Sequence, residues 1–204
     1  MTMESTRSND TTAKAPPFHF SHDASLAQFS VPFKSWIQTN GKPWDGVATG
    51  ALVFDARGRV LLVQRTSHDS MPDLWEVPGG AVDADDASIL HGCARELWEE
   101  AGLAARRVAR LVTEGPGADA FQEFRNSTRS KLIGKFQFEV EVEDEVADGQ
   151  AVRLDPNEHQ DFVWATEDEV EREEVGGNKI PITKRSHKLV ILEGFRLRRG
   201  AQRR

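Results

Sequence analysis

Three glutamates crowd the end of one predicted helix, and this stretch limits the possible folds of the chain more than any other. Residues 95–102 read Arg-Glu-Leu-Trp-Glu-Glu-Ala-Gly. On a helix turning ~100° per residue, Glu96 and Glu100 lie within ~40° of each other, and Glu99 lies ~60° to the other side. The sequence therefore predicts a helix with three carboxylates on one wall.

The opposite wall of this helix is apolar. Its apolar residues recur at the three- and four-residue spacing of a buried stripe, and they are Ile89, Leu90, Cys93, Leu97 and Ala101. Glu100 falls at the edge of this stripe, where burial would desolvate its charge at a high cost unless a partner is present. Gly102 is where a left-handed cap would end the helix, and the helix dipole disfavours anions there.

A divalent cation among the glutamates would explain this crowding, and carboxylate oxygens suit Mg²⁺ or Mn²⁺ better than zinc. A solvated acidic face that carries one arginine is the simpler interpretation of the bare string. The Gly79-Gly80 turn upstream, the glycine at the helix end and the strand-like runs on both sides favour the cation.

These residues resemble the signature of the Nudix hydrolases, which is Gly, five residues, Glu, seven residues, then Arg-Glu-apolar-X-Glu-Glu-X-Gly-apolar. The second half matches at every fixed position, namely Arg95, Glu96, Leu97, Glu99, Glu100, Gly102 and Leu103. The first half differs, because fourteen residues separate Gly80 from Arg95 instead of thirteen and the first Glu is missing. Counting from Gly80 gives Asp86, which could brace the loop as a shorter carboxylate, whereas counting back from Arg95 gives Ala87, which could not. We expect the absence of this first Glu to change the activity of the protein without abolishing it.

The resemblance implies an α+β fold, the Nudix-type α/β/α sandwich with a mixed β-sheet. It also implies that water attacks a phosphorus atom of a diphosphate linkage with the help of Mg²⁺ or Mn²⁺. We predict that Glu96 and Glu100 are metal ligands, that Glu99 is a further ligand or the general base, and that Arg95 orients the cluster.

Two further metal contacts are expected. Glycine lets the backbone approach a ligand closely, so the carbonyl of Gly80 is a candidate ligand, as the resemblance also implies. By the same resemblance, Glu158 is a candidate carboxylate from outside the signature, although a role as a turn residue is as good an interpretation.

The substrate is predicted only as a small-molecule diphosphate, with a nucleoside diphosphate linked to another moiety favoured by family frequency. Arg65, Phe121 and Phe124 are candidate substrate contacts, with solvated or core-covering roles as their alternatives. A non-nucleotide diphosphate, such as a prenyl diphosphate, remains open. So does a Nudix-fold nucleotide-binding or regulatory module with weak catalysis, which the altered first half of the signature favours.

Four segments are predicted along the chain. Residues 1–17 are polar and indicate a disordered tail, and residues 200–204 form a basic C-terminal tail. Residues 47–199 form the catalytic domain. Residues 18–46 are rich in Phe and Trp and are expected to pack on the core, with a pocket for an apolar or aromatic substrate moiety as the alternative.

The predicted elements alternate between strands and helices. Apolar runs at 47–54 and 60–64 favour a hairpin, and further strands are predicted at 74–77, 107–114, 131–143 and 161–165. Within 131–143, apolar and acidic residues alternate, which predicts one solvent-exposed face. Residues 115–130 and 174–182 are predicted loops, and helices are predicted from Thr166 and over 183–199.

Composition excludes several classes of function. The formal net charge of −7 argues against broad nucleic-acid binding, so no specific nucleic-acid partner is expected. The sequence shows neither the apolar core of a signal peptide nor a membrane span, and its single cysteine fits a reducing compartment, so we expect a cytoplasmic protein. Nudix proteins often dimerise, which makes a homodimer a candidate state.

Overall fold

The computed structural model describes residues 18–142 and 152–202, so the predicted tail at 1–17 and the last two basic residues lie outside the described chain. The elements in chain order are β1 (Ser21–His22), η1 (Ala24–Phe29), α1 (Phe33–Thr39), β2 (Gly46–Leu52), β3 (Val60–Arg65), β4 (Trp75–Glu76), α2 (Ile89–Ala101), β5 (Ala105–Val112), β6 (Gln122–Arg125), β7 (Leu132–Val142), β8 (His159–Ala165), α3 (Glu167–Arg172), β9 (Glu174–Val175), β10 (Asn178–Lys179) and α4 (Arg185–Gln202).

The main sheet is mixed, with strand order β1-β5-β7-β2 and with β6 also paired to β7. β2 runs parallel to β7 and β1 runs parallel to β5, whereas β5 and β6 are antiparallel to β7. The free edge of β2 is covered by the Pro78–Val82 loop, since Thr49 N–H donates to the Gly80 carbonyl and Val82 N–H donates to the Val47 carbonyl. The loop that precedes α2 is therefore attached to the sheet.

A second, smaller sheet has the order β4-β3-β8. The predicted hairpin between β2 and β3 is only partly present, because their hydrogen bonds are confined to the ends next to the Gly58 turn. Beyond the turn, β2 pairs with β7 and β3 pairs with β4 and β8. The two strands that flank this turn therefore belong to two different sheets.

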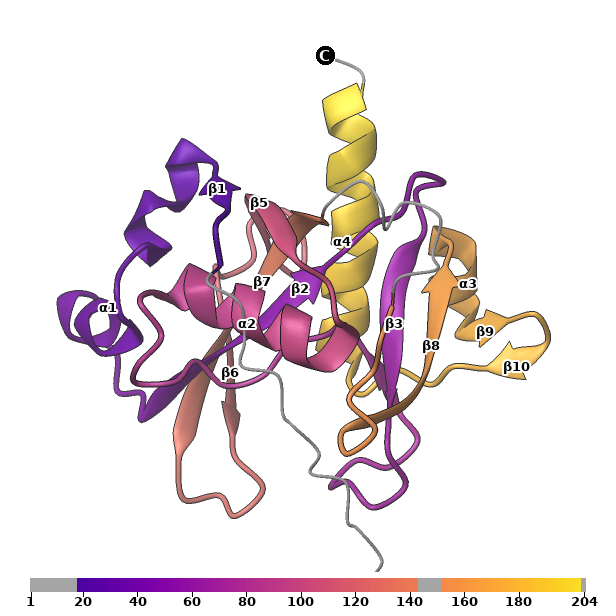
Figure 1. Ribbon diagram of the computed structural model, residues 1–204, viewed down its shortest axis with the longest axis horizontal. Coiled ribbons are helices and arrows are strands. Elements are labelled where there is room, and N and C mark those ends of the chain that lie inside the picture. The colour runs from indigo at the N-terminus through magenta and orange to yellow at the C-terminus, as the bar shows by residue number, and fades with distance from the viewer. Residues whose placement is uncertain (1–17, 143–151, 203–204) are drawn as a thin grey trace, which may run out of the picture.

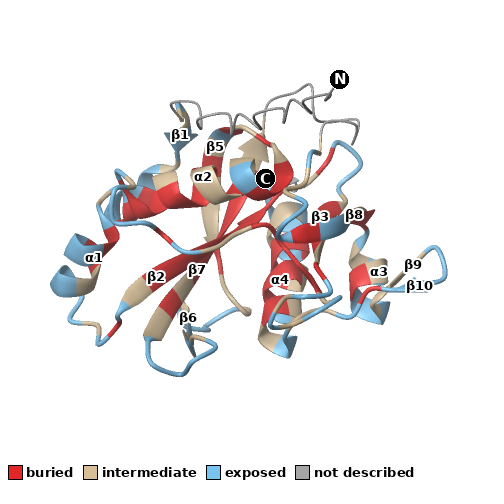
Figure 2. Ribbon diagram, turned by 60° about the horizontal axis from the view of Figure 1, so that its bottom comes forward, coloured by how far each residue is buried: buried red, intermediate tan, exposed pale blue. Residues whose placement is uncertain are grey.

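Helices cover both faces of the main sheet, as the resemblance implied (Figure 1). Along β2, Ala51 and Val53 belong to the apolar core under α2, whereas Leu52 belongs to the core under α4. Because neighbouring strand residues point to opposite faces, α2 and α4 lie on opposite sides of the sheet. This arrangement confirms the predicted α/β/α sandwich, and Figure 2 shows the buried residues running through both interfaces.

Four aromatic residues of the segment before β2 lie in the core, and Phe18 and Phe20 pack against it. Phe29, Phe33, Trp36 and Trp44 are buried, and the ring of Trp36 stacks on that of Trp44 with centroids 5.5 Å apart. The ring of Phe136 meets that of Trp36 edge to face at 4.9 Å. These contacts pin η1 and α1 to the sheet, and Phe33 also reaches the lining of the large cleft described below.

The prediction that one face of residues 131–143 is exposed to solvent is wrong. Gln137 and Glu139 are both buried, because α4 covers that face. Glu139 is neutralised by Arg110 at 2.9 Å and by Arg198 of α4 at 2.6 Å. An alternating pattern shows that two faces differ, but it does not show whether a distant helix brings arginines to the polar one.

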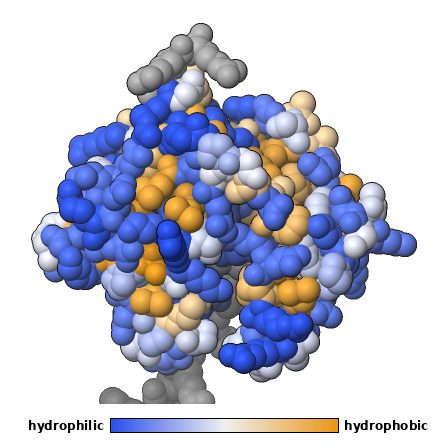
Figure 3. All heavy atoms as spheres, turned by 180° about the vertical axis from the view of Figure 1, so that it is seen from behind, coloured by the Kyte–Doolittle hydropathy of each residue, from blue (hydrophilic) through white to orange (hydrophobic). Residues whose placement is uncertain are grey.

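Three element boundaries also differ from prediction. Residues 174–182 include the β9–β10 hairpin, whose turn is Gly176-Gly177, both with positive φ. The predicted loop at 115–130 contains β6, and the last helix continues to Gln202 instead of ending at Arg199. In the described ranges, no helix has both the length and the apolar character that a bilayer span requires. Figure 3 shows a largely hydrophilic surface behind the sheet, with apolar residues in separate groups.

Candidate metal and substrate site

Helix α2 is capped at both ends, and its end is the one that the sequence predicts. The Ser88 hydroxyl oxygen accepts a hydrogen bond from His91 N–H at the start, and Gly102 adopts a left-handed φ of 69° at the end. The predicted apolar stripe from Ile89 to Ala101 is buried, so the three glutamates occupy the opposite wall.

Glu100 is 5% exposed and lies against the glycine loop. Its Oε2 accepts a hydrogen bond of 2.6 Å from Gly79 N–H. Burial raises the pKa of Glu100 well above its usual value, and the neighbouring charges of Glu96, Glu76 and Glu158 add to this effect. The Gly79 N–H works in the other direction but does not outweigh burial.

Glu96 faces the next glycine. A Cβ at position 80 would lie 2.5 Å from its Oε2, so only glycine leaves room for the carboxylate at its present place. Burial raises the pKa of Glu96 to about 7, even though Arg95 at 2.9 Å lowers it. The donors beside these two glutamates therefore compensate the negative charge of their carboxylates only in part.

Arg95 organises the outer side of the cluster. Its guanidinium donates to Glu96, to Glu99 at 2.7 Å and to the Ala81 carbonyl at 2.8 Å. Two further hydrogen bonds, of 3.1 and 2.9 Å, hold the two carboxylate oxygens of Asp86. Asp86 also accepts a hydrogen bond from Asp83 N–H at 2.7 Å, so its carboxylate braces the loop to the helix.

Glu158 approaches the helix from the loop before β8. Ligand atoms of Glu100, Glu158 and His159 all lie within 4.8 Å of one another. His159 is buried, and its Nδ1 has no hydrogen-bond partner in the described chain. Two carboxylates and an imidazole at this spacing, with Glu96 alongside, fit a divalent cation by number and chemistry.

The other two predicted metal ligands, the Gly80 carbonyl and Glu99, do not belong to this cluster of three ligand atoms. The Gly80 carbonyl accepts a hydrogen bond from Thr49 N–H at 2.9 Å, so one lone pair remains for a cation. The Glu99 side chain is 43% exposed and bonds to Arg95. The metal-binding and catalytic roles of Glu96, Glu99, Glu100, Gly80, Glu158 and Arg95 stay predictions.

A cleft of about 1050 Å³ begins at the Gly79–Ala84 loop. Its floor includes Ala48 of β2 and Lys135 of β7, and its far end includes the start of α4. Arg65 and Phe124, two of the predicted substrate contacts, line this cleft.

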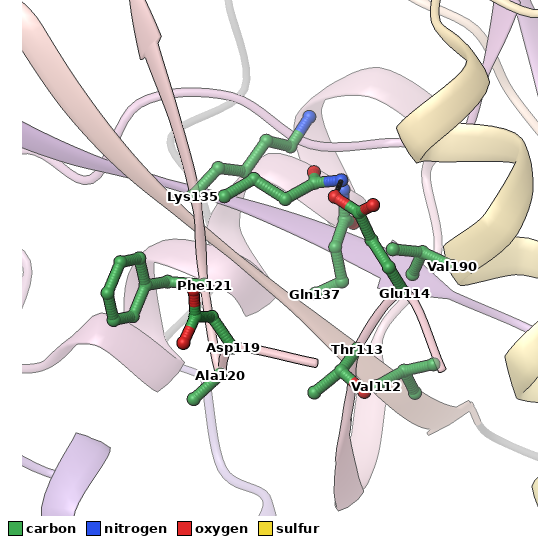
Figure 4. Close-up of a pocket in the computed structure, with 10 residues that line it drawn as sticks. Val112, Thr113, Glu114, Asp119, Ala120, Phe121, Lys135, Gln137 and Val190 are labelled. Carbon is green, nitrogen blue, oxygen red and sulfur yellow. Dashed lines mark hydrogen bonds between the residues drawn. The ribbon is translucent and has the colours of Figure 1, made fainter. Parts of the chain in front are cut away.

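Phe121, the third, packs instead on Trp44 with ring centroids 4.9 Å apart. It lines a separate cavity of about 10 Å³, room for roughly one water molecule (Figure 4). The structure therefore does not bring Phe121 to the cleft.

Glu76 and His159 are site residues that the sequence reasoning missed. Glu76 lines the cleft, pairs with Arg65 and lies 4.0 Å from His159 Nε2. Burial would raise the pKa of Glu76, but the contact with His159 and the charges of Lys135 and Arg65 lower it to about 2. The available signal was a charged residue inside an otherwise apolar strand directly before the Pro78-Gly79-Gly80 turn.

Comparison with known proteins gives a family match over most of the chain. The family model of the NUDIX domain matches residues 44–185. The phosphatase NudJ of Escherichia coli K12 is 40% identical over 58 residues, which are 28% of this chain and 36% of NudJ. The match thus spans about a third of the length of that curated relative.

Solved structures share the fold. A MutT protein from Methanosarcina mazei superposes with a TM-score of 0.54 at 22% identity, covering 76% of this chain and 94% of that one. The NUDIX domain of Shewanella oneidensis NrtR, in complex with ADP ribose, gives a TM-score of 0.54 at 18% identity, covering 80% of this chain and 98% of that one.

Proposed function

Because this chain belongs to the Nudix hydrolase family, we propose that it hydrolyses a diphosphate linkage in a small molecule with the help of a divalent cation. The observation that carries the proposal is the placement of two incompletely neutralised carboxylates, the buried Glu100 and the largely buried Glu96, against the glycine loop that lines one end of a large cleft. The catalytic unit is the domain predicted at residues 47–199.

Glu96, Glu100 and Glu158 would hold Mg²⁺ or Mn²⁺, with Glu99, His159 and the Gly80 carbonyl as further donors. The cation would neutralise diphosphate oxygens and make water a better nucleophile. The chain itself does the positioning, since the Gly79 N–H fixes Glu100 and Arg95 fixes Glu96 and Glu99. Glu99, the most exposed of the three, is the candidate base that takes the proton of the attacking water.

The lining of the cleft favours a nucleoside diphosphate derivative over a prenyl diphosphate. The volume is on the scale of pockets that hold nucleotide-sized ligands. Basic side chains, among them Lys131, Lys135 and Lys184, line it together with Phe124. An isoprenoid tail would bury these charges without a partner, whereas a nucleotide offers polar atoms and a ring for stacking.

The test uses Glu96→Gln, Glu99→Gln and Glu100→Gln on a panel of diphosphates with Mg²⁺ or Mn²⁺, with products identified by mass. We expect Glu96→Gln and Glu100→Gln to lower kcat by at least about a hundredfold, because each removes a charge that the cation needs. Glu171→Gln, on the exposed side of α3, is the matched control and should retain full turnover. If all three variants turn over like the wild type, the proposed site is wrong.

A binding or regulatory module is the second candidate. The extra residue and the missing Glu in the first half of the signature favour it, but Asp86 already fills the bracing position beside Arg95. A module would bind a nucleotide and release no product, so product analysis after prolonged incubation separates the two.

The cellular setting is also a proposal. Cys93 is a free, buried cysteine, consistent with the reducing cytoplasm that the sequence predicts. A homodimer stays a prediction, which sedimentation equilibrium would test.

A further inference from the structure

The cleft joins the glycine loop to a group of basic side chains. Its one end is formed by residues 79–84, against whose two glycines Glu100 and Glu96 of α2 lie. Its other wall is lined by five basic side chains, namely Arg65, Arg125, Lys131, Lys135 and Lys184. Arg65 is neutralised by Asp69 and Glu76. Within residues 18–142 and 152–202, the other four form no ion pair with a carboxylate, and we call these four the basic wall.

The carboxylates on this side do not cancel the basic wall. Four carboxylates line the cleft. Glu76 pairs with Arg65, Asp83 lies 3.6 Å from Arg95, and the other two are held by other donors. Asp45 accepts a hydrogen bond from Leu132 N–H at 2.7 Å, and Glu123 accepts one from the Trp44 indole at 2.7 Å. Four cations against two carboxylates leave an excess of two positive charges, in a chain whose formal net charge is −7.

Lys135 is the member of the basic wall whose distance from the glycine loop is fixed by the strand register. Ala81, directly after the glycine loop, pairs with Ala48 of β2, which in turn pairs with Lys135 of β7. Directly paired residues share one face of a sheet, and neighbouring strands lie ~4.8 Å apart. The Cα of Lys135 is therefore about 10 Å from that of Ala81, on the face that forms the cleft floor.

The surroundings of Lys135 supply further donors. The carboxylate that its charge influences, Glu76, is already paired with Arg65. In Figure 4 its ammonium points away from Asp119, and no hydrogen bond joins it to the residues drawn. His187 of α4 also lines the cleft, is 5% exposed, and has an Nε2 without a hydrogen-bond partner in the described chain. Thr183 and Ser186, at the first turn of the 18-residue helix α4, complete this end of the cleft, where the helix dipole adds partial positive charge.

We propose that the basic wall binds a second phosphate group of the substrate, remote from the diphosphate that is cleaved. The distance of about 10 Å between Ala81 and Lys135 is on the scale of a nucleoside or of two further phosphate units. The second phosphate group could therefore be attached to the nucleoside or belong to a longer phosphate chain. Basic side chains that face a cleft without an ion-pair partner are expected where a bound ligand supplies the negative charge. Phosphate is an anion that lysine, arginine and helix N-termini bind well. A neutral substrate tail would leave both the ammonium of Lys135 and the Nε2 of His187 without partners.

This inference rests on the proposed function, because the substrate comparison requires hydrolysis. The phosphate-binding test described below does not require it. The two sources of the second phosphate are distinguished by two substrate pairs. ADP-ribose and its 2′-phosphate differ by a phosphomonoester, and diadenosine diphosphate and tetraphosphate differ by chain length. For the wild type, kcat/KM should be at least about tenfold higher for the more phosphorylated member of one pair.

Lys135→Met should lower that ratio about tenfold, and Lys184→Met should lower it in the same direction by a smaller factor. Lys34→Met, an exposed lysine of α1 that does not line the cleft, is the matched control and should leave the ratio unchanged. Because the charges act through solvent-accessible space, the preference should also fall with rising salt. A wild-type ratio near one in both pairs, or a ratio that Lys135→Met leaves unchanged, overturns the inference.

Phosphate binding without turnover separates the two proposals. Inorganic phosphate is titrated at constant ionic strength with EDTA present, and the thermal midpoint is followed. We expect phosphate to stabilise the wild type and Glu100→Gln alike, and to bind Lys135→Met about tenfold more weakly. If phosphate binds through Lys135 but no diphosphate is cleaved, the proposed function fails and the subsite stands. If diphosphates are cleaved and Lys135→Met binds phosphate like the wild type, the subsite fails and the proposed function stands.

Discussion

At the scale of single residues, the glutamates of the candidate metal site should destabilise the folded protein when no cation is bound. Glu100 is buried and the Glu96 side chain is only 12% exposed, and the one arginine beside them is shared with Asp86 and Glu99. Burial is the main cause of the raised pKa values of both glutamates. Their charged forms are therefore disfavoured in the folded protein.

The first prediction follows for the metal-free protein. The pKa of Glu96 is about 7 when folded and near 4.5 when unfolded, so the folded state binds more protons between these values. Stability should then fall as pH rises from about 4.5 to 7 and stay low above 7. Glu96→Gln should remove this loss, and at pH 8 it should be more stable than the wild type by about 1–3 kcal/mol.

Urea denaturation in EDTA at pH 5 and pH 8 measures this difference. Glu99→Gln is the matched control, because its side chain is 43% exposed and its removal should change stability little at either pH. An equal effect of Glu96→Gln at both pH values would contradict the prediction.

Asp86 answers a question that counting along the chain left open. The signature could be aligned from either end, which gave Asp86 or Ala87 at the position of the missing Glu. The structure brings Asp86 to Arg95 through two hydrogen bonds, so the shorter carboxylate takes the bracing position and the extra residue is absorbed before the helix.

At the scale of elements, the loop at residues 78–82 connects the sheet to α2. Gly79 has a φ of 150° and lies against the Thr49 backbone, whereas Gly80 needs no unusual φ and lies against the Glu96 carboxylate. The two glycines are therefore required for different reasons, one by the fold and the other by the site.

The second prediction compares alanine at the two positions. Gly79→Ala should destabilise the protein by about 2 kcal/mol or more, because its Cβ would overlap the β2 backbone at a φ that alanine disfavours. Gly80→Ala should change stability by less than about 1 kcal/mol but lower kcat at least tenfold, because it displaces Glu96.

Thermal unfolding and kcat are measured for both variants. Gly200→Ala is the control, since nothing lies within 4 Å of its Cβ position. The interpretation fails if Gly80→Ala loses stability and activity together as Gly79→Ala does.

At the scale of the whole molecule, the candidate metal centre joins the two sheets. Glu100 lies on α2, which packs on the main sheet, and Glu158 leads into β8 of the smaller sheet. A cation between them would link parts of the molecule that otherwise share the β2–β3 turn and the apolar cores.

The third prediction is that Mg²⁺ or Mn²⁺ stabilises the wild type. At a hundred times its Kd, the cation should add about 2.7 kcal/mol and raise the midpoint of thermal unfolding by roughly 5–10 °C. The increase should be larger at pH 8 than at pH 5, because protonated Glu96 and Glu100 bind cations poorly.

Differential scanning fluorimetry with and without the cation provides the measurement. Glu158→Gln should lose most of the increase, and the surface variant Glu171→Gln should keep it. A cation effect that Glu158→Gln leaves intact would place the metal elsewhere.

Local pattern was enough to predict α2, its C-terminal cap at Gly102 and its buried stripe, because helical periodicity and capping depend on residues within a few positions of one another. It also indicated the carboxylate wall and, through the family signature, the sandwich fold. It did not show that Glu139 is buried, that Phe121 lies outside the cleft, that Glu76, Lys135 and His187 line it, or that His159 lies beside Glu76. Those outcomes depend on which strands pair and on which face α4 covers, and such contacts join residues far apart in the chain.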